Sequence, residues 1–231
     1  MPDLARCEPP RDCGRCVRLV AYRDECRRTM PAWHNAPVPS LGPLSARLLV
    51  VGLAPGLKGA NRTGIPFVGD DAGNLLLATL LEFGLAKSAY RSGGAHDVRA
   101  YPGAARDFSL SDCLITNAVR CVPPGNKPTS AEISTCRQFL AATMGGMSRL
   151  RAILVLGRIA HDSTLRTLDR RLAAHPFAHG SRHEIQPGLT LFDSFHCSRY
   201  NVNTGRLTPT MFRAVLAAIQ AELGPAMVDG E

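Results

Sequence analysis

The chain has 231 residues and a formal net charge of +8, from 27 Lys and Arg residues against 19 Asp and Glu residues. Its hydrophobic fraction of 45% excludes a largely disordered chain, and its length suits a single globular domain over residues 1–231. No apolar run reaches the ~18 residues of a membrane helix and no signal peptide is evident, so we expect a cytoplasmic protein without a membrane span.

The composition of the first 45 residues predicts an irregular segment. Four of the eight cysteines (Cys7, Cys13, Cys16 and Cys26) lie there among prolines and arginines, and no periodic apolar pattern accompanies them. Thiols stay reduced in the cytoplasm, which favours metal ligands or buried thiols over disulfides. We therefore expect residues 1–45 to be ordered by a bound metal group and residues 46–224 to form an α/β core.

Strand and helix patterns alternate four times along this core. Thr129 followed by Glu132 is a capping box, which marks the start of one helix. The alternation predicts a three-layer α/β/α sandwich with a central four-stranded parallel sheet and function at the carboxyl ends of its strands. We predict strands at 48–53, 113–118, 152–157 and 189–196, helices at 72–83, 130–144, 158–168 and 209–223, and a surface insertion at 86–111.

Two long motifs follow the first and last predicted strands. Residues 52–56 (GLAPG), 61–64 (NRTG) and 66–70 (PFVGD) closely resemble the first motif of the uracil-DNA glycosylase superfamily. Residues 196–208 (HCSRYNVNTGRLT) resemble its second motif, and the details are most similar to family 5, the B-type glycosylases of bacteria and archaea. Two residues depart from the usual motifs. Ile65 stands where an Arg is usual, and Cys197 stands where a Pro or Val is usual.

The resemblance implies a monofunctional glycosylase that hydrolyses the N-glycosidic bond of uracil, and of other deaminated bases such as hypoxanthine, after the nucleotide has flipped out of DNA. This reaction initiates base excision repair. The implied setting is a prokaryotic nucleoid, and we expect a monomer. The alternatives are a family 4-type enzyme, against which Leu53 argues, and a non-catalytic iron–sulfur protein that binds DNA or senses redox state.

Three residues carry the implied chemistry of the base. His196 would donate a hydrogen bond to the uracil carbonyl as negative charge develops, and Phe67 would stack on the flipped base. Asn117 would pair with the edge of the base. Each residue also has an ordinary alternative. His196 could be a partly buried histidine whose hydrogen bonds are made within the protein, Phe67 could simply pack in the core, and Asn117 could form a turn or a helix cap.

Ala54 is informative because other branches of the superfamily carry a carboxylate or an amide at or beside this position. The apolar variant resembles family 5 and suggests that catalysis depends on stabilising the leaving base. Asn61 and Asp70 are the candidates for holding the attacking water. A polar-poor pocket also fits the implied tolerance for bases other than uracil.

The second motif is expected to enter the DNA. Ser198 would bind phosphate, and Tyr200, with Arg199 as the alternative, would fill the space that the flipped base leaves. Arg62 and Arg206 would contact phosphates, unless they belong to ordinary solvated turns. Residues 149–213 hold ten Arg against four Asp and Glu residues, as a DNA-facing surface requires.

Two cysteine pairs predict a four-thiolate site. Cys13 and Cys16 form a C-x2-C pair, and Cys121 and Cys136 form a C-x14-C pair. Spacing alone leaves zinc and an iron–sulfur cluster open. The resemblance, which includes residues 120–128 (RCVPPGNKP), implies a [4Fe–4S] cluster on these four residues. Cys7 and Cys26 are the rival ligands, and Cys113 and Cys197 are expected to be ordinary thiols.

Overall fold

The four predicted strands form the parallel part of a five-stranded sheet in the computed structural model, which describes residues 3–88 and 108–224. The strand order is β4-β1-β5-β7-β6, and β6 runs antiparallel to β7 at the edge. The strands are β1 (Leu48–Gly52), β4 (Cys113–Asn117), β5 (Ala152–Leu156), β6 (Arg182–Gln186) and β7 (Leu189–Ser194).

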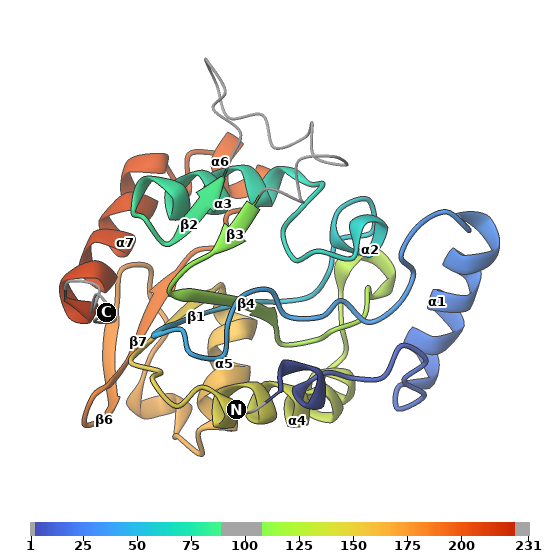
Figure 1. Cartoon of the computed structure of the whole chain (residues 1–231), viewed down its shortest axis with the longest axis horizontal. Coiled ribbons are helices and arrows are strands. Elements are labelled where there is room, and N and C mark those ends of the chain that lie inside the picture. Colours follow the sequence, from blue (N-terminus) through green and yellow to red (C-terminus); the bar gives the residue numbers. More distant parts are fainter. Residues whose placement is uncertain (1–2, 89–107, 225–231) are drawn as a thin grey trace, which may run out of the picture.

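Helices cover both faces of this sheet, which confirms the predicted three-layer sandwich (Figure 1). Leu48 and Val50 belong to one apolar layer with α3 (Asp71–Glu82) and α7 (Pro209–Leu223). Leu49 and Val51 point to the other layer, which contains α4 (Ser130–Gly146) and α5 (Arg158–Thr167). This alternation follows from the two-residue period of a strand, and burial on both faces explains why β1 is apolar throughout.

The edge strand β6 is the part of the sheet that the sequence did not predict. Of its five residues only Ile185 is buried, because a strand at the edge packs one side chain inward and leaves its charged residues in solvent. It therefore carries no apolar run by which it could be recognised. The four predicted strands correspond to β1, β4, β5 and β7.

The capping box at the start of α4 is present as predicted. Thr129 Oγ1 accepts from the Glu132 backbone N–H (3.3 Å), and the Glu132 carboxylate accepts from the Thr129 N–H (2.7 Å). The same carboxylate accepts two hydrogen bonds from the guanidinium of Arg18 (2.8 and 2.7 Å). The helix cap thus also holds part of the N-terminal segment.

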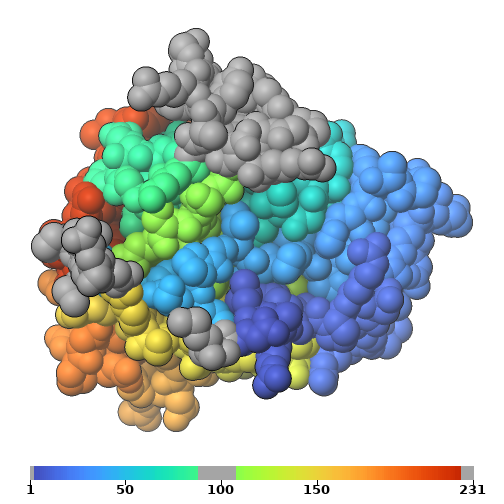
Figure 2. Space-filling view, viewed as in Figure 1, coloured from blue at the N-terminus to red at the C-terminus, as the bar shows by residue number. Residues whose placement is uncertain are grey.

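That N-terminal segment contains helices, whereas we expected it to be irregular. A short 3-10 helix, η1 (Leu4–Cys7), precedes α1 (Val17–Thr29), in which only Leu19, Arg23 and Cys26 are buried. A helix with so narrow a buried face lacks the apolar stripe that identifies an amphipathic helix in a sequence. In Figure 2 the segment lies at one side of the molecule, next to the residues of α4.

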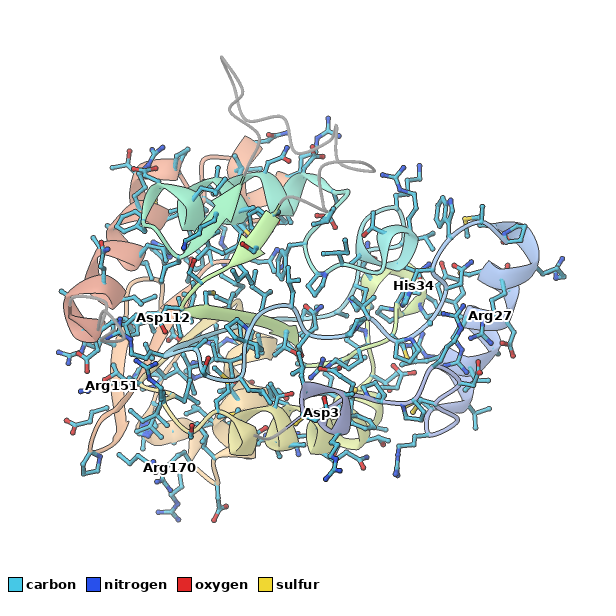
Figure 3. The ribbon with its side chains drawn as sticks, in the orientation of Figure 1. Asp3, Arg27, His34, Asp112, Arg151 and Arg170 are labelled. Atoms are coloured by element: carbon cyan, nitrogen blue, oxygen red, sulfur yellow. The ribbon has the colours of Figure 1, made fainter. Side chains whose placement is uncertain are left out.

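Hydrogen bonds from arginines tie α1 to the chain on either side of it. Arg23 donates to the Cys13 carbonyl (3.0 Å) and Arg27 to the Asn35 carbonyl (3.0 Å). Figure 3 shows Arg27 on α1 and His34 on the segment that returns toward the sheet. Charged side chains rather than an apolar core therefore order much of this segment.

The remaining described elements are short. β2 (Ala86–Ser88) and β3 (Phe108–Leu110) form an antiparallel pair, and most of the expected insertion at 86–111 lies outside the described residues. None of the described helices is long and apolar enough to cross a membrane. The other short elements are α2 (Ala60–Thr63), η4 (Pro124–Asn126), η5 (Leu172–Ala174) and α6 (Arg199–Asn203).

Candidate active site and thiol cluster

A cavity of about 310 Å³ opens where the loops after β1, β4 and β7 meet. Its walls contain both apolar residues and a few polar side chains, as ligand sites generally do. The predicted site residues that line it are Ala54, Phe67, Asp70, Asn117, His196, Ser198 and Arg199. Asn61, Arg62, Tyr200 and Arg206 are not among its lining residues.

Phe67 reaches the cavity from an unusual backbone conformation. Its φ of 59° lies in the left-handed region, which is rare for a bulky residue and is found mainly where the surroundings enforce it. One such constraint is Gly73, where a Cβ atom would collide with the Phe67 carbonyl oxygen. The ring lies 6.2 Å from the His196 ring, with 29° between the two planes.

Asn117 and Phe67 converge on the backbone of Gly52. The last residue of β1 is paired in register with the last residue of β4, which places Asn117 beside Gly52. A Cβ atom at Gly52 would collide with Asn117 Oδ1 and would lie 2.7 Å from Phe67 Cζ. The glycine that begins the first motif therefore gives these two side chains the space to meet.

His196 follows β7 and is held by the helix after it. Asn201 Nδ2 donates to the His196 carbonyl (2.8 Å), and α6, which contains Asn201, begins with Ser198 as its N-cap. Burial lowers the pKa of His196 to about 4, because the cavity wall disfavours the charged ring. The imidazole is therefore neutral at neutral pH and has one N–H to donate.

The two candidates for holding water occupy different places. Asp70 caps α3 by accepting from the Gly73 N–H (3.3 Å), and burial raises the pKa of its carboxyl group. Cβ atoms at Gly56 or Gly59 would run into this carboxylate, so the two glycines let it lie against the loop. Asn61 does not line the cavity: its Nδ2 donates to Asn35 Oδ1 (2.9 Å) and links the loop to the N-terminal segment.

The residues expected to contact DNA lie at the rim. Arg199 pairs at 3.7 Å with Asp71, which also lines the cavity, and Tyr200 is 72% exposed despite its size. The guanidinium of Arg206 stacks over the Phe195 ring at 4.6 Å. Arg62 is exposed on α2.

Two cavity residues with polar side chains, Asp71 and Asn126, were not predicted as site residues from the sequence. Asp71 directly follows Asp70, the last residue of the first motif. This position beside the motif is the sequence feature from which Asp71 could have been predicted. Asn126 belongs to the loop between Cys121 and Cys136, and its positive φ of 58° is a conformation that Asn tolerates better than most residues. This loop thus reaches both the thiols and the cavity.

The four predicted cysteines line one small cavity of about 20 Å³. Cys13 and Cys16 precede or begin α1, Cys121 follows β4, and Cys136 lies on α4. The Arg120 N–H donates to Cys136 Sγ (3.3 Å). Burial raises the pKa of Cys121 to about 12 and that of Cys136 to about 11.

The rival cysteines have other surroundings. Cys7 Sγ donates to the Ala142 carbonyl (3.3 Å), and Cys26 is buried on α1; neither lines the thiol cavity. Within the described part of the chain, no three of the four predicted sulfur atoms lie within 4.8 Å of one another. A tetrahedral zinc ion with Zn–S bonds of 2.3 Å would hold its four sulfurs about 3.8 Å apart.

Comparisons with known proteins agree with this arrangement. The family model of the uracil-DNA glycosylase superfamily matches residues 39–220. A type-5 uracil-DNA glycosylase of Thermus thermophilus is 41% identical over 210 residues, covering 88% of this chain and 90% of that protein. One from Pyrobaculum aerophilum is 36% identical over 96% of this chain and 99% of its own length.

A type-4 uracil-DNA glycosylase of Pyrobaculum aerophilum is more distant. It is 27% identical over 161 residues, covering 69% of this chain and 68% of its own length. The family 5 features of the two motifs and the higher identity to type-5 proteins over a longer stretch point the same way. The chain therefore belongs to the uracil-DNA glycosylase superfamily, in its family 5 branch.

Proposed function

We propose that this protein hydrolyses the N-glycosidic bond of uracil flipped out of DNA, leaves an abasic site and so initiates base excision repair. The observation that carries the proposal is the convergence of Phe67, Asn117 and His196 on one cavity at the carboxyl ends of the strands. All three come from one chain, which supports action as a monomer. No lysine lines the cavity among the described residues, which supports hydrolysis by water rather than a lyase step through an amine.

Phe67 and Asn117 would receive the base. Stacking on an aromatic ring contributes about 1–3 kcal/mol per base, and an amide can pair with a carbonyl and an N–H on one base edge. Because both side chains lie against Gly52, the stacking face and the pairing edge have a fixed relation to each other. Such a fixed relation selects for the shape and the hydrogen-bonding edge of the base.

His196 would stabilise the departing base. The developing negative charge lies on a carbonyl oxygen, and the neutral imidazole donates its N–H to that oxygen without first losing a proton. Loss of one preorganised donor in a comparable oxyanion site costs about 2.7–4 kcal/mol. The backbone around His196, held by Asn201, keeps the donor oriented.

Asp70 would hold the attacking water. It is a carboxylate in the cavity wall, and the neighbouring Leu53 and Ala54 carry no polar side-chain atom. A hydrogen bond from water to Asp70 would orient the water toward the sugar carbon as positive charge develops there. The apolar Leu53 and Ala54 would also admit other deaminated bases, such as hypoxanthine.

The four cysteines would hold a [4Fe–4S] cluster. A four-thiolate donor set suits iron–sulfur clusters as well as zinc, and the resemblance of residues 120–128 to the family's cluster loop favours the cluster. The cluster would join α1 to the loop after β4 and to α4. Through that loop it would also support Asn126 at the cavity.

A duplex with one uracil opposite guanine tests the proposed function. After incubation with the protein, alkali cleaves any abasic site, so strand scission reports base removal. The wild-type protein should produce scission at the uracil, and His196→Ala should reduce the single-turnover rate by about 100-fold or more. Absence of scission with cluster-loaded wild-type protein, or an undiminished rate with His196→Ala, would contradict the assignment.

A further inference from the structure

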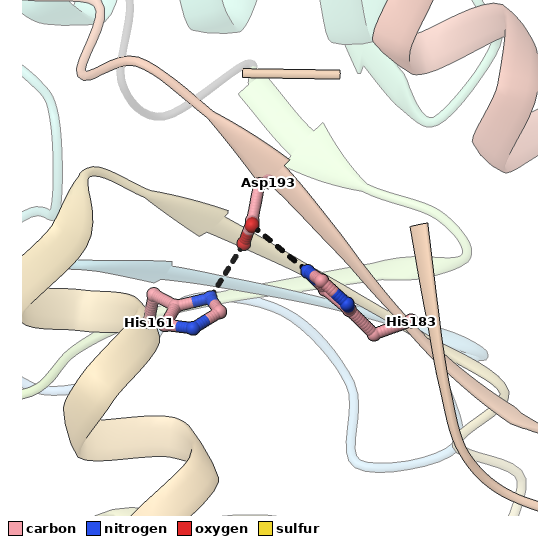
Figure 4. A group of neighbouring side chains, drawn as sticks. All are labelled: His161, His183 and Asp193. Carbon is pink, nitrogen blue, oxygen red and sulfur yellow. Dashed lines mark hydrogen bonds and ion pairs between the residues drawn. The ribbon is translucent and has the colours of Figure 1, made fainter. Parts of the chain in front are cut away.

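A second cluster of metal-ligating side chains lies on the α4/α5 side of the sheet, outside the cavity (Figure 4). It consists of His161 from α5, His183 from β6 and Asp193 from β7, with one ligand atom of each within 4.8 Å of the others. His161 and Asp193 are buried, and the His183 side chain is 12% exposed. Neither sequence motif contains these residues.

Asp193 occupies a position in the strand that an apolar side chain would ordinarily fill. Its neighbours on the same side of β7, Leu189 and Leu191, belong to the apolar layer beneath α4 and α5. A carboxylate with no exposed surface is costly in such a layer unless positive charge compensates it. Asp193 therefore needs positive charge beside it, from a protonated histidine or a bound cation.

The contacts of His161 indicate where that positive charge would lie. Its Nε2 is 2.9 Å from the His175 carbonyl oxygen, which can only accept, so Nε2 carries hydrogen. A neutral imidazole has one N–H, so Nδ1 then presents a lone pair to Asp193 Oδ1 at 2.7 Å. Two lone pairs at this distance require a proton or a metal ion between them.

We propose that His161 Nδ1, His183 Nε2 and the Asp193 carboxylate form a site for a divalent transition metal ion of the zinc class. Two imidazoles and one carboxylate suit such ions better than they suit Ca²⁺ or Mg²⁺, which prefer oxygen donors. A metal-binding histidine also normally donates its other N–H to a carbonyl or carboxylate, as His161 does to His175.

The donor spacing needs only a small adjustment to receive the ion. Tetrahedral ligands at 2.0–2.1 Å from zinc lie about 3.3–3.4 Å apart. The present separations from Asp193 are 2.7 Å to His161 Nδ1 and 3.1 Å to His183 Nε2. The His161–Asp193 pair would open by about 0.6–0.7 Å and the His183–Asp193 pair by about 0.2–0.3 Å to reach this spacing, and water would take the fourth position.

Protons balance when the ion binds. The metal takes the place of the hydrogen between His161 Nδ1 and Asp193, and that proton leaves to solvent. His183 Nε2, which donates to Asp193 Oδ2 (3.1 Å), gives up its hydrogen as it becomes a ligand, and the ring takes up a proton on Nδ1, so His183 exchanges no net proton. The ion would join α5, β6 and β7. It would also fix the segment in which the Ala178 N–H donates to the Asp193 carboxylate (3.2 Å) and the Gly180 N–H donates to the Asp193 backbone carbonyl (2.9 Å).

Metal titration of the cluster-loaded protein tests this site, because the cysteines are then occupied. We expect one equivalent of Zn²⁺ to bind with proton release and a higher unfolding temperature. One equivalent of Co²⁺ should give the visible d–d bands of a tetrahedral site. His183→Gln should lower the affinity for both ions by about tenfold or more. The His34→Gln variant, which changes a half-buried histidine elsewhere in the chain, should bind both ions as wild type does.

The outcomes separate this inference from the glycosylase proposal, because none is an activity measurement. Asp193→Asn gives a second variant, which retains hydrogen bonding but lacks the charge. Metal binding that is equally strong in wild type and in His183→Gln would overturn the site. So would the absence of binding together with a doubly protonated His161 in nitrogen NMR, since a proton would then supply the positive charge.

Discussion

The Phe67 ring lies 6.2 Å from the His196 ring, with 29° between their planes. The two side chains follow β1 and β7, which are separated in the sheet by β5. The cavity is therefore assembled from segments that follow different strands of the sheet, at the edge where ligands bind in open parallel sheets. A base stacked on Phe67 would lie near the neutral His196. The excision rate should therefore depend on where the Phe67 ring is held.

Gly52→Ala should strongly reduce uracil excision with little loss of folding. The added methyl group would collide with Asn117 Oδ1 and lie 2.7 Å from Phe67 Cζ, so at least one of these side chains must move. A displacement of about 1 Å at a site of chemistry can cost 100-fold in rate. Single-turnover scission of a uracil duplex measures the effect.

Gly145→Ala is the matched control for this substitution. A Cβ atom at Gly145 on α4 meets no other atom within 4 Å, so the rate should equal that of wild type. Equal rates for Gly52→Ala and Gly145→Ala would show that Phe67 and Asn117 need not keep their present places.

The excision rate should depend little on His196 between pH 7.5 and pH 5. Burial lowers the pKa of His196 to about 4, so about 90% of the rings remain neutral at pH 5. A histidine with the ordinary pKa of about 6.5 would retain about 3%. Below pH 5 the rate should fall as the ring loses its neutral form.

The same shift affects stability in a defined direction. The folded state disfavours protonation of His196. The stability that the neutral ring contributes is therefore fully present above about pH 6.5 and is lost as pH falls toward 4. Histidine NMR titration measures the pKa directly. A midpoint near 6.5 for His196 would contradict both expectations.

Tyr200→Ala should impair excision from double-stranded DNA more than from single strands. The side chain is 72% exposed on α6, beside the cavity rim that Arg199 forms, where it could fill the space left in the base stack. A single strand offers no stack to restore. We expect a rate loss of about tenfold or more on duplex substrate, from the few kcal/mol that unstacking costs, and near-wild-type rates on single strands.

Val17→Ala provides the control for the loss of an exposed apolar side chain. Val17 is 83% exposed on α1, and the substitution should leave both rates unchanged. If Tyr200→Ala lowered the two rates equally, Tyr200 would serve the flipped base or the fold rather than the duplex.

The sequence predicts the parts of the fold in which one physical signal dominates. The apolar strand β1 and the capped helix α4 were predicted because burial on both faces and the Thr129–Glu132 pair each leave a local pattern. β6 was not predicted because Ile185 is its only buried residue. α1 was not predicted because hydrogen bonds from its arginines to the chain on either side hold it, and these leave no apolar pattern.

The candidate site shows the same division. Residues within the two motifs, such as Phe67 and His196, were predicted because their place in the motif fixes them after a strand. Asn126 was not, because its approach to the cavity depends on how the loop between Cys121 and α4 folds back. The direction of Asn61 toward Asn35 likewise depends on the path of the N-terminal segment, which no local pattern specifies.

The buried ion pair between Arg120 and Glu8 should contribute strongly to stability. Arg120 Nη1 donates to Glu8 Oε2 (2.6 Å) and to Ser40 Oγ (2.7 Å), and the Arg120 side chain is 1% exposed. Glu8→Gln would leave a buried guanidinium without its counter-charge. Removal of one partner from a buried pair costs about 3–5 kcal/mol, and the 10% exposure of Glu8 leads us to expect about 2–4 kcal/mol.

Glu82→Gln is the same chemical change at an exposed pair. Glu82 accepts from Arg213 Nε (2.7 Å), and both side chains are about half exposed, so we expect a loss of at most about 1 kcal/mol. Chemical denaturation of the two cluster-loaded variants measures the difference. Because Arg120 also donates its backbone N–H to Cys136, Glu8→Gln should release the proposed cluster at lower denaturant concentration than Glu82→Gln does. Equal unfolding free energies and equal cluster release would mean that the N-terminal segment is held without this ion pair.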